Sequence, residues 1–260
     1  MNLQVLVSTM HQTDHSLLEK MNIKSEAIIV NQCNTNNFEE FKYKGNNIRI
    51  ISLAERGVGL SRNTALMRST ADICLFADDD VTYVDNYKNL VIDAFQQQPD
   101  ADMIVFNVPS SNPERKSKKI AQHRRVRWFN SLKYGTYRMA IKTESFKEKN
   151  IYFSLLFGGG AKYSSGEDSL FIFEAINKGL KVYANPSLIG KVSQKESTWF
   201  RGYTDKYFFD KGALYGCLSK KWSNLLALQF VIRHRKMFDK EKNWLNAYKL
   251  MADGIKAINK

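Results

Sequence analysis

Short apolar runs separated by stretches of helical spacing are the feature that most restricts the fold of this chain. The runs are Leu3–Val7, Ala27–Val30, Ile48–Leu53, Ile73–Ala77 and Met103–Val108. Apolar residues at helical spacing lie between them, around residues 17–21, 60–67 and 84–95. This alternation predicts βα units around a mainly parallel sheet. Ligands of such sheets bind beyond the carboxyl ends of the strands, so the residues after each run are candidates for a site.

Composition excludes several classes. The 260 residues are 43% hydrophobic and 12% aromatic, which is ordinary for a globular protein and argues against disorder or low complexity. The three cysteines share no CxxC spacing, so we expect a reducing compartment rather than a disulfide framework. No signal peptide is recognised at the start, and no run of about 18 apolar residues occurs. A cytoplasmic protein is expected.

The net charge of +13 is unevenly distributed. Residues 1–110 carry 9 Lys and Arg against 14 Asp and Glu, a net charge of −5, and residues 111–260 therefore carry +18. A basic excess confined to one half indicates a surface for an anionic partner, namely nucleic acid, anionic lipid or a phosphorylated substrate. Charge alone does not distinguish these partners.

Three aspartates, Asp78, Asp79 and Asp80, directly follow the fourth apolar run. Hard oxygen ligands at a strand end suit Mg²⁺ or Mn²⁺, which often shares its remaining positions with water and substrate phosphates. A solvated turn that caps the next helix would also account for them.

Two further segments have both a structural and a functional interpretation. Residues 55–63 combine two glycines with Arg62, which could contact a phosphate or a base, or lie on the surface of a helix that Ser61 caps. Glu167 and Asp168 follow Gly166 at the start of a helical stretch, where a carboxylate serves as a simple cap or as a general base.

The order of these segments resembles the family 2 glycosyltransferases of GT-A fold. The matching residues are Ser8–Thr9, Ile28–Gln32, Gly57–Asn63, Phe76–Val81 and Gly166–Asp168. The resemblance covers roughly residues 1–190. It implies a Rossmann-like α/β fold with a mainly parallel sheet flanked by helices, and a nucleotide-diphosphate sugar as donor, with UDP-sugars favoured.

The resemblance also implies a role for each motif residue. Asp80 would hold Mn²⁺ or Mg²⁺ at the diphosphate, and Asp78 would share the metal or contact the ribose. Asp79 and Arg62 would lie on the nucleotide side. Asp168 would deprotonate the acceptor hydroxyl in an inverting transfer, and Glu167 would position the acceptor. The acceptor would be a saccharide or a lipid-linked saccharide in surface polysaccharide synthesis.

Some candidate binding residues have weaker signals. Asn31 and Gln32 stand where the family commonly has an acidic pair, and their amide oxygens can still accept from the imide N–H of uracil. Thr9, at the end of the first predicted strand, is counted with them as a residue that faces the base. Gly159 and Gly160 resemble the family's glycine-rich approach to the acceptor, although a tight loop is an equal interpretation. Trp199 could stack on a sugar and Arg201 could neutralise diphosphate, whereas packing of Trp199 and Phe200 in the C-terminal region is the alternative interpretation.

The domain prediction divides the chain at residue 190. Residues 1–110 are expected to bind the nucleotide sugar and residues 111–190 the acceptor, followed by a basic helical region over 191–260. From Lys220 onward we expect two amphipathic helices, lying on an anionic membrane surface at the inner face of the cell membrane or packed against the core.

Two other function classes remain as alternatives. A nucleotidyltransferase would also use acidic metal ligands beside a parallel sheet, but no lysine-bearing glycine-rich loop appears near the start of the chain. A basic nucleic-acid-binding protein would use residues 115–137, yet it would leave the aspartates and Gly166–Asp168 without a role. No nucleic acid is therefore expected as a partner.

Overall fold

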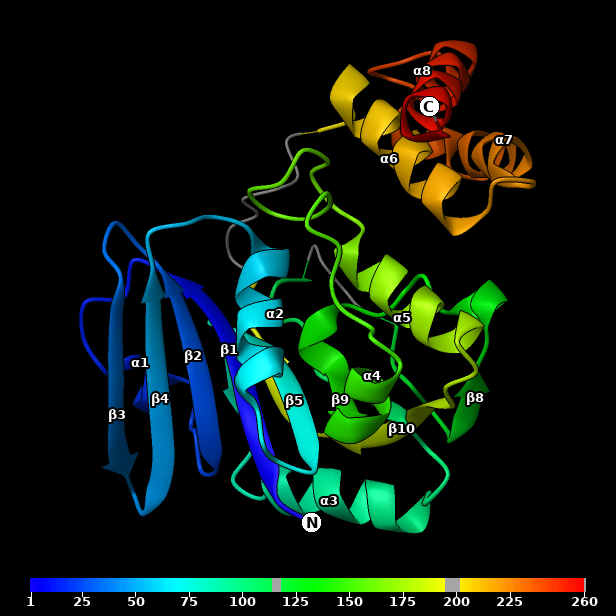
Figure 1. Ribbon diagram of the computed structural model, residues 1–260. Helices are drawn as coiled ribbons and strands as arrows, with labels where there is room; N and C mark the ends of the chain where they lie inside the picture. Colours follow the sequence, from blue (N-terminus) through cyan, green and yellow to red (C-terminus); the bar gives the residue numbers. More distant parts are fainter. Residues whose placement is uncertain (114–117, 195–201, 260) are drawn as a thin grey trace.

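A nine-stranded sheet forms the centre of the computed structural model, which describes residues 1–113, 118–194 and 202–259 (Figure 1). The strand order is β3-β4-β2-β1-β5-β9-β7-β10-β8. The bounds of the strands are β1 Leu3–Met10, β2 Glu26–Gln32, β3 Asn37–Tyr43, β4 Asn46–Leu53, β5 Ile73–Asp78, β7 Met103–Asn107, β8 Arg124–Val126, β9 Met139–Lys142 and β10 Val182–Leu188. Strands β4, β2, β1 and β5 are parallel neighbours, and β7 is parallel to β10. The predicted α/β fold with a large, mostly parallel sheet is confirmed.

Helices cover both faces of the sheet. The bounds of the helices outside the C-terminal region are α1 Leu17–Lys20, α2 Val58–Arg68, α3 Tyr87–Gln97, α4 Thr143–Glu148 and α5 Glu167–Asn177. One apolar cluster joins α1 and α3 to alternate residues of β1 and β2, such as Val7 and Ile29. A second cluster joins α2, α4 and α5 to the other set, such as Leu6 and Ile28. Because successive strand residues point to opposite faces, the continuous apolar runs serve both clusters.

Several connecting elements complete this part of the chain. A short antiparallel pair, β6 (Val81–Tyr83) with β11 (Gly190–Val192), lies beside the carboxyl end of β5. Single 3₁₀ turns form η2 (Trp128–Asn130) and η3 (Thr136–Arg138). The predicted division at residue 190 falls at the first residue of β11.

Three helices form the C-terminal region, beyond α5 and away from the sheet (Figure 1). They are α6 (Asp205–Leu218), α7 (Ser223–Arg233) and α8 (Trp244–Asn259), with the turn η4 (Arg235–Met237) between the last two. Helices α6 and α8 pack so closely that a methyl group on Gly212 would overlap the carbonyl of Met251, and one on Gly254 the carbonyl of Phe209. A third apolar cluster joins these helices to Phe157 and Tyr163 of the preceding loop.

Three sequence-based expectations need correction. Strand β3 was not expected, because it is half exposed and carries no apolar run. It forms an antiparallel hairpin with β4, and the turn between the two strands contains Gly45, whose φ is +80°. Helix α2 begins at Val58, so Ser61 is an interior residue rather than its cap. Helix α6 precedes the two predicted tail helices, and Thr204 caps it by accepting from the N–H of Tyr207 at 3.2 Å.

Candidate active site

The carboxyl ends of three adjacent parallel strands bring the candidate residues together. In the sheet register Ser8 lies opposite Asp78, Thr9 opposite Asn31, and Met10 opposite Gln32. This edge is where ligands bind in open α/β sheets. The residues selected from the ends of the apolar runs are therefore neighbours in space.

Each of the three aspartates has a different environment. Asp78 ends β5 and accepts from Arg62 Nη2 at 2.8 Å. Asp79 Oδ2 accepts from the hydroxyl of Thr9 at 2.6 Å. Asp80 Oδ2 accepts from the backbone N–H of Gln194 at 2.9 Å. The pKa of Asp80 is raised, first by burial and then by the negative charges of Asp78 and Asp79. The cluster therefore carries negative charge that a cation would stabilise.

These aspartates fit a metal that brings other ligands with it. Among the described residues, no group of three or more His, Cys, Asp or Glu side chains is arranged to hold a metal ion. Mg²⁺ commonly takes only one or two carboxylates and fills its octahedron with water and substrate phosphates. Asp78 and Asp80 supply the hard oxygen atoms that such a site needs.

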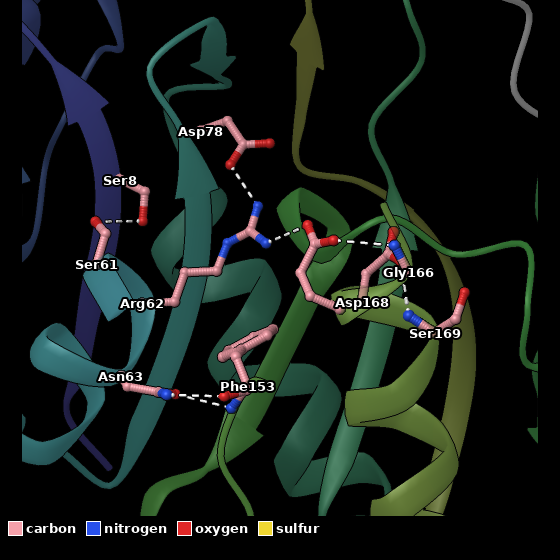
Figure 2. A network of polar contacts seen from close by, with 10 residues as sticks. Ser8, Ser61, Arg62, Asn63, Asp78, Phe153, Gly166, Asp168 and Ser169 are labelled. Atoms are coloured by element: carbon pink, nitrogen blue, oxygen red, sulfur yellow. Dashed lines mark hydrogen bonds and ion pairs between the residues drawn. The ribbon is translucent and has the colours of Figure 1, made fainter. Parts of the chain in front are cut away.

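Three consecutive residues of α2 organise the centre of the site (Figure 2). Ser61 donates to Ser8 Oγ at 2.9 Å and so ties α2 to β1. Asn63 exchanges two hydrogen bonds with the backbone of Phe153, at 2.8 and 2.9 Å. Between them, Arg62 lies with its guanidinium carbon 5.3 Å from the centre of the Phe153 ring.

Arg62 connects the aspartate cluster to the start of α5. Its guanidinium donates to Asp78 Oδ1 at 2.8 Å and to Glu167 Oε1 at 2.9 Å, and its side chain is only 6% exposed. Burial alone would lower the pKa of Arg62, but the two carboxylates raise it above its ordinary value. The side chain expected to contact the nucleotide is thus held between two carboxylates.

Asp168 and Glu167 begin α5 but differ in their partners. Glu167 is held by Arg62 and by the N–H of Gly166, which donates to Oε2 at 3.1 Å. Asp168 accepts from the N–H of Ser169 at 2.6 Å. Burial, followed by the negative charge of Glu167, raises the pKa of Asp168 to about 7. A carboxylate with such a pKa is well matched to proton transfer near neutral pH.

The glycine-rich loop closes against the same helix ends. The carbonyl of Gly159 accepts from the N–H of Val58 at 2.9 Å. Gly158 has a φ of +104°, and a Cβ there would lie 2.9 Å from the carboxyl group of Glu167. Gly159 and Gly160 are exposed. The loop therefore reaches the site, with its two predicted glycines facing solvent.

The predicted base-binding amides have protein partners. Asn31 donates to the carbonyl of Gln12 at 2.9 Å and accepts from its N–H at 3.0 Å. Gln32 Oε1 accepts from the N–H of Gly57 at 2.7 Å. Thr9 accepts from Gln12 Nε2 at 2.9 Å. Both amides are buried at the site's edge. Trp199 and Arg201 lie outside the described residues.

Two residues at the site were not selected from the sequence. Lys211 of α6 is close enough to Asp168 to lower the pKa of that carboxyl, while burial lowers the pKa of Lys211 itself. Tyr137 of η3 has a pKa raised by burial and, with smaller effects, by Asp78, Asp168 and Asp80. No short motif marks either residue, although Tyr137 falls among the aromatic residues of the basic segment 114–149.

Taken together, the strand ends, the acidic turn and the acidic helix start define a sugar-nucleotide-dependent transferase of GT-A type. The family model described as glycosyl transferase family 2 matches residues 7–157. The chain belongs to this family and is a glycosyltransferase. Membership decides against the nucleotidyltransferase and nucleic-acid-binding alternatives.

Solved structures show the same fold. The crystal structure of S. aureus TarS 1-349 in complex with UDP-GlcNAc has a TM-score of 0.65 and 16% identity, with 99% of this chain and 84% of that chain covered. The complex of the same TarS fragment with UDP has a TM-score of 0.64 and 16% identity, covering 99% and 83%. The fragment without a named ligand has a TM-score of 0.64 and 15% identity, with the same coverage. A search of the curated proteins gave no match.

Proposed function

We propose that this glycosyltransferase moves a sugar from a UDP-sugar to a hydroxyl group of a saccharide or lipid-linked saccharide, with inversion at the anomeric carbon. The observation that carries the proposal is the placement of two acidic groups on either side of Arg62. Asp78, the first residue of the aspartate cluster, accepts from one nitrogen of the guanidinium, and Glu167, which directly precedes Asp168, accepts from another. Support for a uridine donor comes from the TarS structures, which hold UDP-GlcNAc and UDP.

The donor would occupy the carboxyl ends of β1, β2 and β5. Asp80 and Asp78 would hold Mn²⁺ or Mg²⁺, which neutralises the charge that develops on the departing diphosphate. Thr9, Asn31 and Gln32 border the nucleoside side of this edge, and Asp79 fixes Thr9 there through their 2.6 Å hydrogen bond. Arg62 acts as a positioning residue, because its guanidinium forms ion pairs with two protein carboxylates, those of Asp78 and Glu167.

Asp168 would act as the general base. The ionised carboxylate of Asp168 would remove the proton from the acceptor hydroxyl as that oxygen attacks the anomeric carbon. The new glycosidic C–O bond forms on the face opposite the diphosphate, and the bond from the anomeric carbon to the phosphate oxygen breaks, with its electron pair leaving on the diphosphate. Glu167 keeps the start of α5 in place through Arg62.

The acceptor would approach over the glycine loop. Gly159 and Gly160 are exposed. A Cβ on Gly160 would lie 3.1 Å from the backbone nitrogen of Gly57, at the start of α2. Trp199 and Arg201 remain candidates for contacts with the acceptor and the diphosphate. We retain the division into a catalytic part, residues 1–190, with a donor half (1–110) and an acceptor half (111–190), followed by a helical region, 191–260.

The compartment is part of the same proposal. Nucleotide sugars are cytosolic, and we place the enzyme in the cytoplasm, at the inner face of the cell membrane, acting in surface polysaccharide synthesis. Within the described residues, no helix is both long enough and apolar enough to cross a bilayer.

A donor panel tests the proposal. The purified chain is incubated with Mn²⁺ and with UDP-, GDP- and dTDP-sugars, and binding and slow donor hydrolysis are measured. A UDP-sugar should bind in a metal-dependent manner. Binding of no nucleotide sugar in the presence of metal would overturn the proposal, and preference for a GDP- or dTDP-sugar would overturn its uridine part.

A further inference from the structure

The outer face of α7 exposes large apolar side chains to solvent. Trp222, at the start of the helix, is 55% exposed, Leu225 is 56% exposed and Ile232 is 61% exposed. The opposite face, formed by Ser223, Ala227 and Val231, is buried. At 100° per residue the three exposed positions fall within one quarter of the helix circumference, opposite the buried set. We call Trp222, Leu225 and Ile232 the outer stripe.

Amphipathic helices of globular proteins normally turn their polar face outward. Here the inner face is already packed against α6 and α8, and an apolar stripe points outward as well. Met237, in the turn that follows α7, adds a further apolar side chain that is 52% exposed. An apolar surface of this kind, rimmed by polar residues, is typical of an interaction site.

The charged residues of the segment that contains the outer stripe, residues 211–238, have only one sign. Residues 211–238 contain six Lys and Arg residues and no Asp or Glu. Lys220 and Lys221 precede the helix, Arg233 is its last residue, and Arg235 and Lys236 follow it. All five are exposed. A partner for this surface must accept apolar side chains at its centre and supply negative charge around them.

An anionic lipid surface has both properties. The apolar side chains enter the boundary between headgroups and acyl chains, while lysine and arginine side chains reach the negatively charged headgroups. A nucleic acid would meet the charges but would leave the aliphatic centre of the face without a partner.

We propose that the outer stripe of α7 and its basic rim form a membrane-docking surface for anionic phospholipid, with α7 lying parallel to the bilayer. This proposal rests on α7 itself and holds for any activity of the catalytic part. Its functional consequence rests on the proposed lipid-linked acceptor. Helix α6 packs against α7 in one apolar cluster and carries Lys211, whose charge acts on Asp168, so α6 connects the docking surface to the helix that bears the candidate base (Figure 1).

Vesicle flotation with the full chain tests the proposal. The vesicles are phosphatidylcholine alone or phosphatidylcholine with about one third phosphatidylglycerol. The wild-type chain should float with the anionic vesicles only, and less at 1 M salt, where the Debye length is about 3 Å. The triple variant W222A/L225A/I232A should bind about a hundredfold more weakly. Phe38→Ala, which removes a 57% exposed apolar side chain from β3, is the control and should float like wild type.

A charge variant tests the rim separately. In K220Q/K221Q/K236Q, each lost charge should weaken binding about fivefold, giving about a hundredfold together. The matched control K20Q/K42Q/K191Q removes three exposed lysines outside the C-terminal helices, so it has the same net charge as the rim variant. If both sets weaken binding equally, net charge alone accounts for it, and the docking surface is refuted.

Two measurements decide whether the bilayer is the occupant. Brominated lipid should quench tryptophan emission in the wild-type chain more than in Trp222→Phe, since only Trp222 is proposed to enter the bilayer. Equal quenching in the two proteins would overturn the proposal.

Light scattering without lipid provides the second measurement. A dimer that W222A/L225A/I232A converts to a monomer would show that a second copy covers the outer stripe, and would also overturn it.

Discussion

Replacing Asp168 with asparagine should stabilise the fold at alkaline pH while abolishing transfer. Asparagine keeps the shape of the side chain but cannot ionise. In the folded chain, burial and Glu167 raise the pKa of Asp168 from an ordinary value of 3.8 to about 7. Between these two values the folded state binds a proton that the unfolded state has released. Stability therefore falls as pH rises from about 4 to about 7, and stays lowered above that.

The size of the effect follows from the two pKa values. The difference between 3.8 and about 7 corresponds to about 4 kcal/mol at pH 8, and to about 1.5 kcal/mol at pH 5. Asp168 as a residue is only partly buried, so we discount the penalty for solvent screening. We therefore expect the difference in free energy of unfolding between Asp168→Asn and wild type to grow by about 2 kcal/mol from pH 5 to pH 8, in favour of the variant.

Urea unfolding of the metal-free proteins at pH 5, 6, 7 and 8 measures this gain. The control is Asp93→Asn, which replaces an exposed aspartate of α3 and should follow the wild-type pH dependence. If the Asp168→Asn variant keeps a constant difference from wild type over this range, Asp168 does not carry a raised pKa. Loss of a general base should lower turnover by about 10²–10⁴-fold, with donor binding retained. Undiminished transfer would remove Asp168 from that role whatever the unfolding data show.

Four other variants and a metal chelator have expected outcomes. Arg62→Met leaves two carboxylates without their buried partner and should lower the free energy of unfolding by about 3 kcal/mol in urea titration. An unchanged urea midpoint would show that the ion pairs of Arg62 with Asp78 and Glu167 do not stabilise the fold. Lys211→Met removes a positive charge near Asp168, so the acidic limb of the kcat/KM profile should move to higher pH. Gly254→Ala forces α6 and α8 apart and should destabilise the chain by about 2 kcal/mol in thermal melts. A chelator should abolish donor binding, and added Mn²⁺ should restore it. Asp80→Asn should raise the Mn²⁺ concentration needed for this recovery. If that concentration is unchanged, Asp80 is not a metal ligand.

The sequence predicted the parts of the fold that depend on local patterns. The apolar runs located β1, β2, β4, β5 and β7, because strands buried on both faces need continuous apolar residues. Strand β3 lacks that signal, since one face is in water and it is stabilised by pairing with β4. Helix α6 was missed because its apolar residues are spread around the helix rather than along one face.

The candidate site was also predicted only in part. The aspartates after β5 and the acidic start of α5 follow from motif order, but their connection does not. Arg62 and Glu167 are 105 residues apart in sequence, and their pairing depends on how α2 and α5 pack against the sheet. The same holds for Lys211, whose place beside Asp168 comes from the packing of α6. Such contacts are properties of tertiary structure, and no spacing in one chain reveals them.

The bridge through Arg62 links the two sides of the site thermodynamically. One guanidinium balances Asp78 and Glu167 together. Any cation that neutralises Asp78 leaves more of this positive charge to act on Glu167, and the pKa of neighbouring Asp168 falls in response. Linkage is reciprocal, so ionisation of Asp168 must in turn strengthen cation binding at Asp78 by the same factor. An empty cation site therefore favours the protonated form of Asp168, and a cation bound at Asp78 favours its carboxylate form.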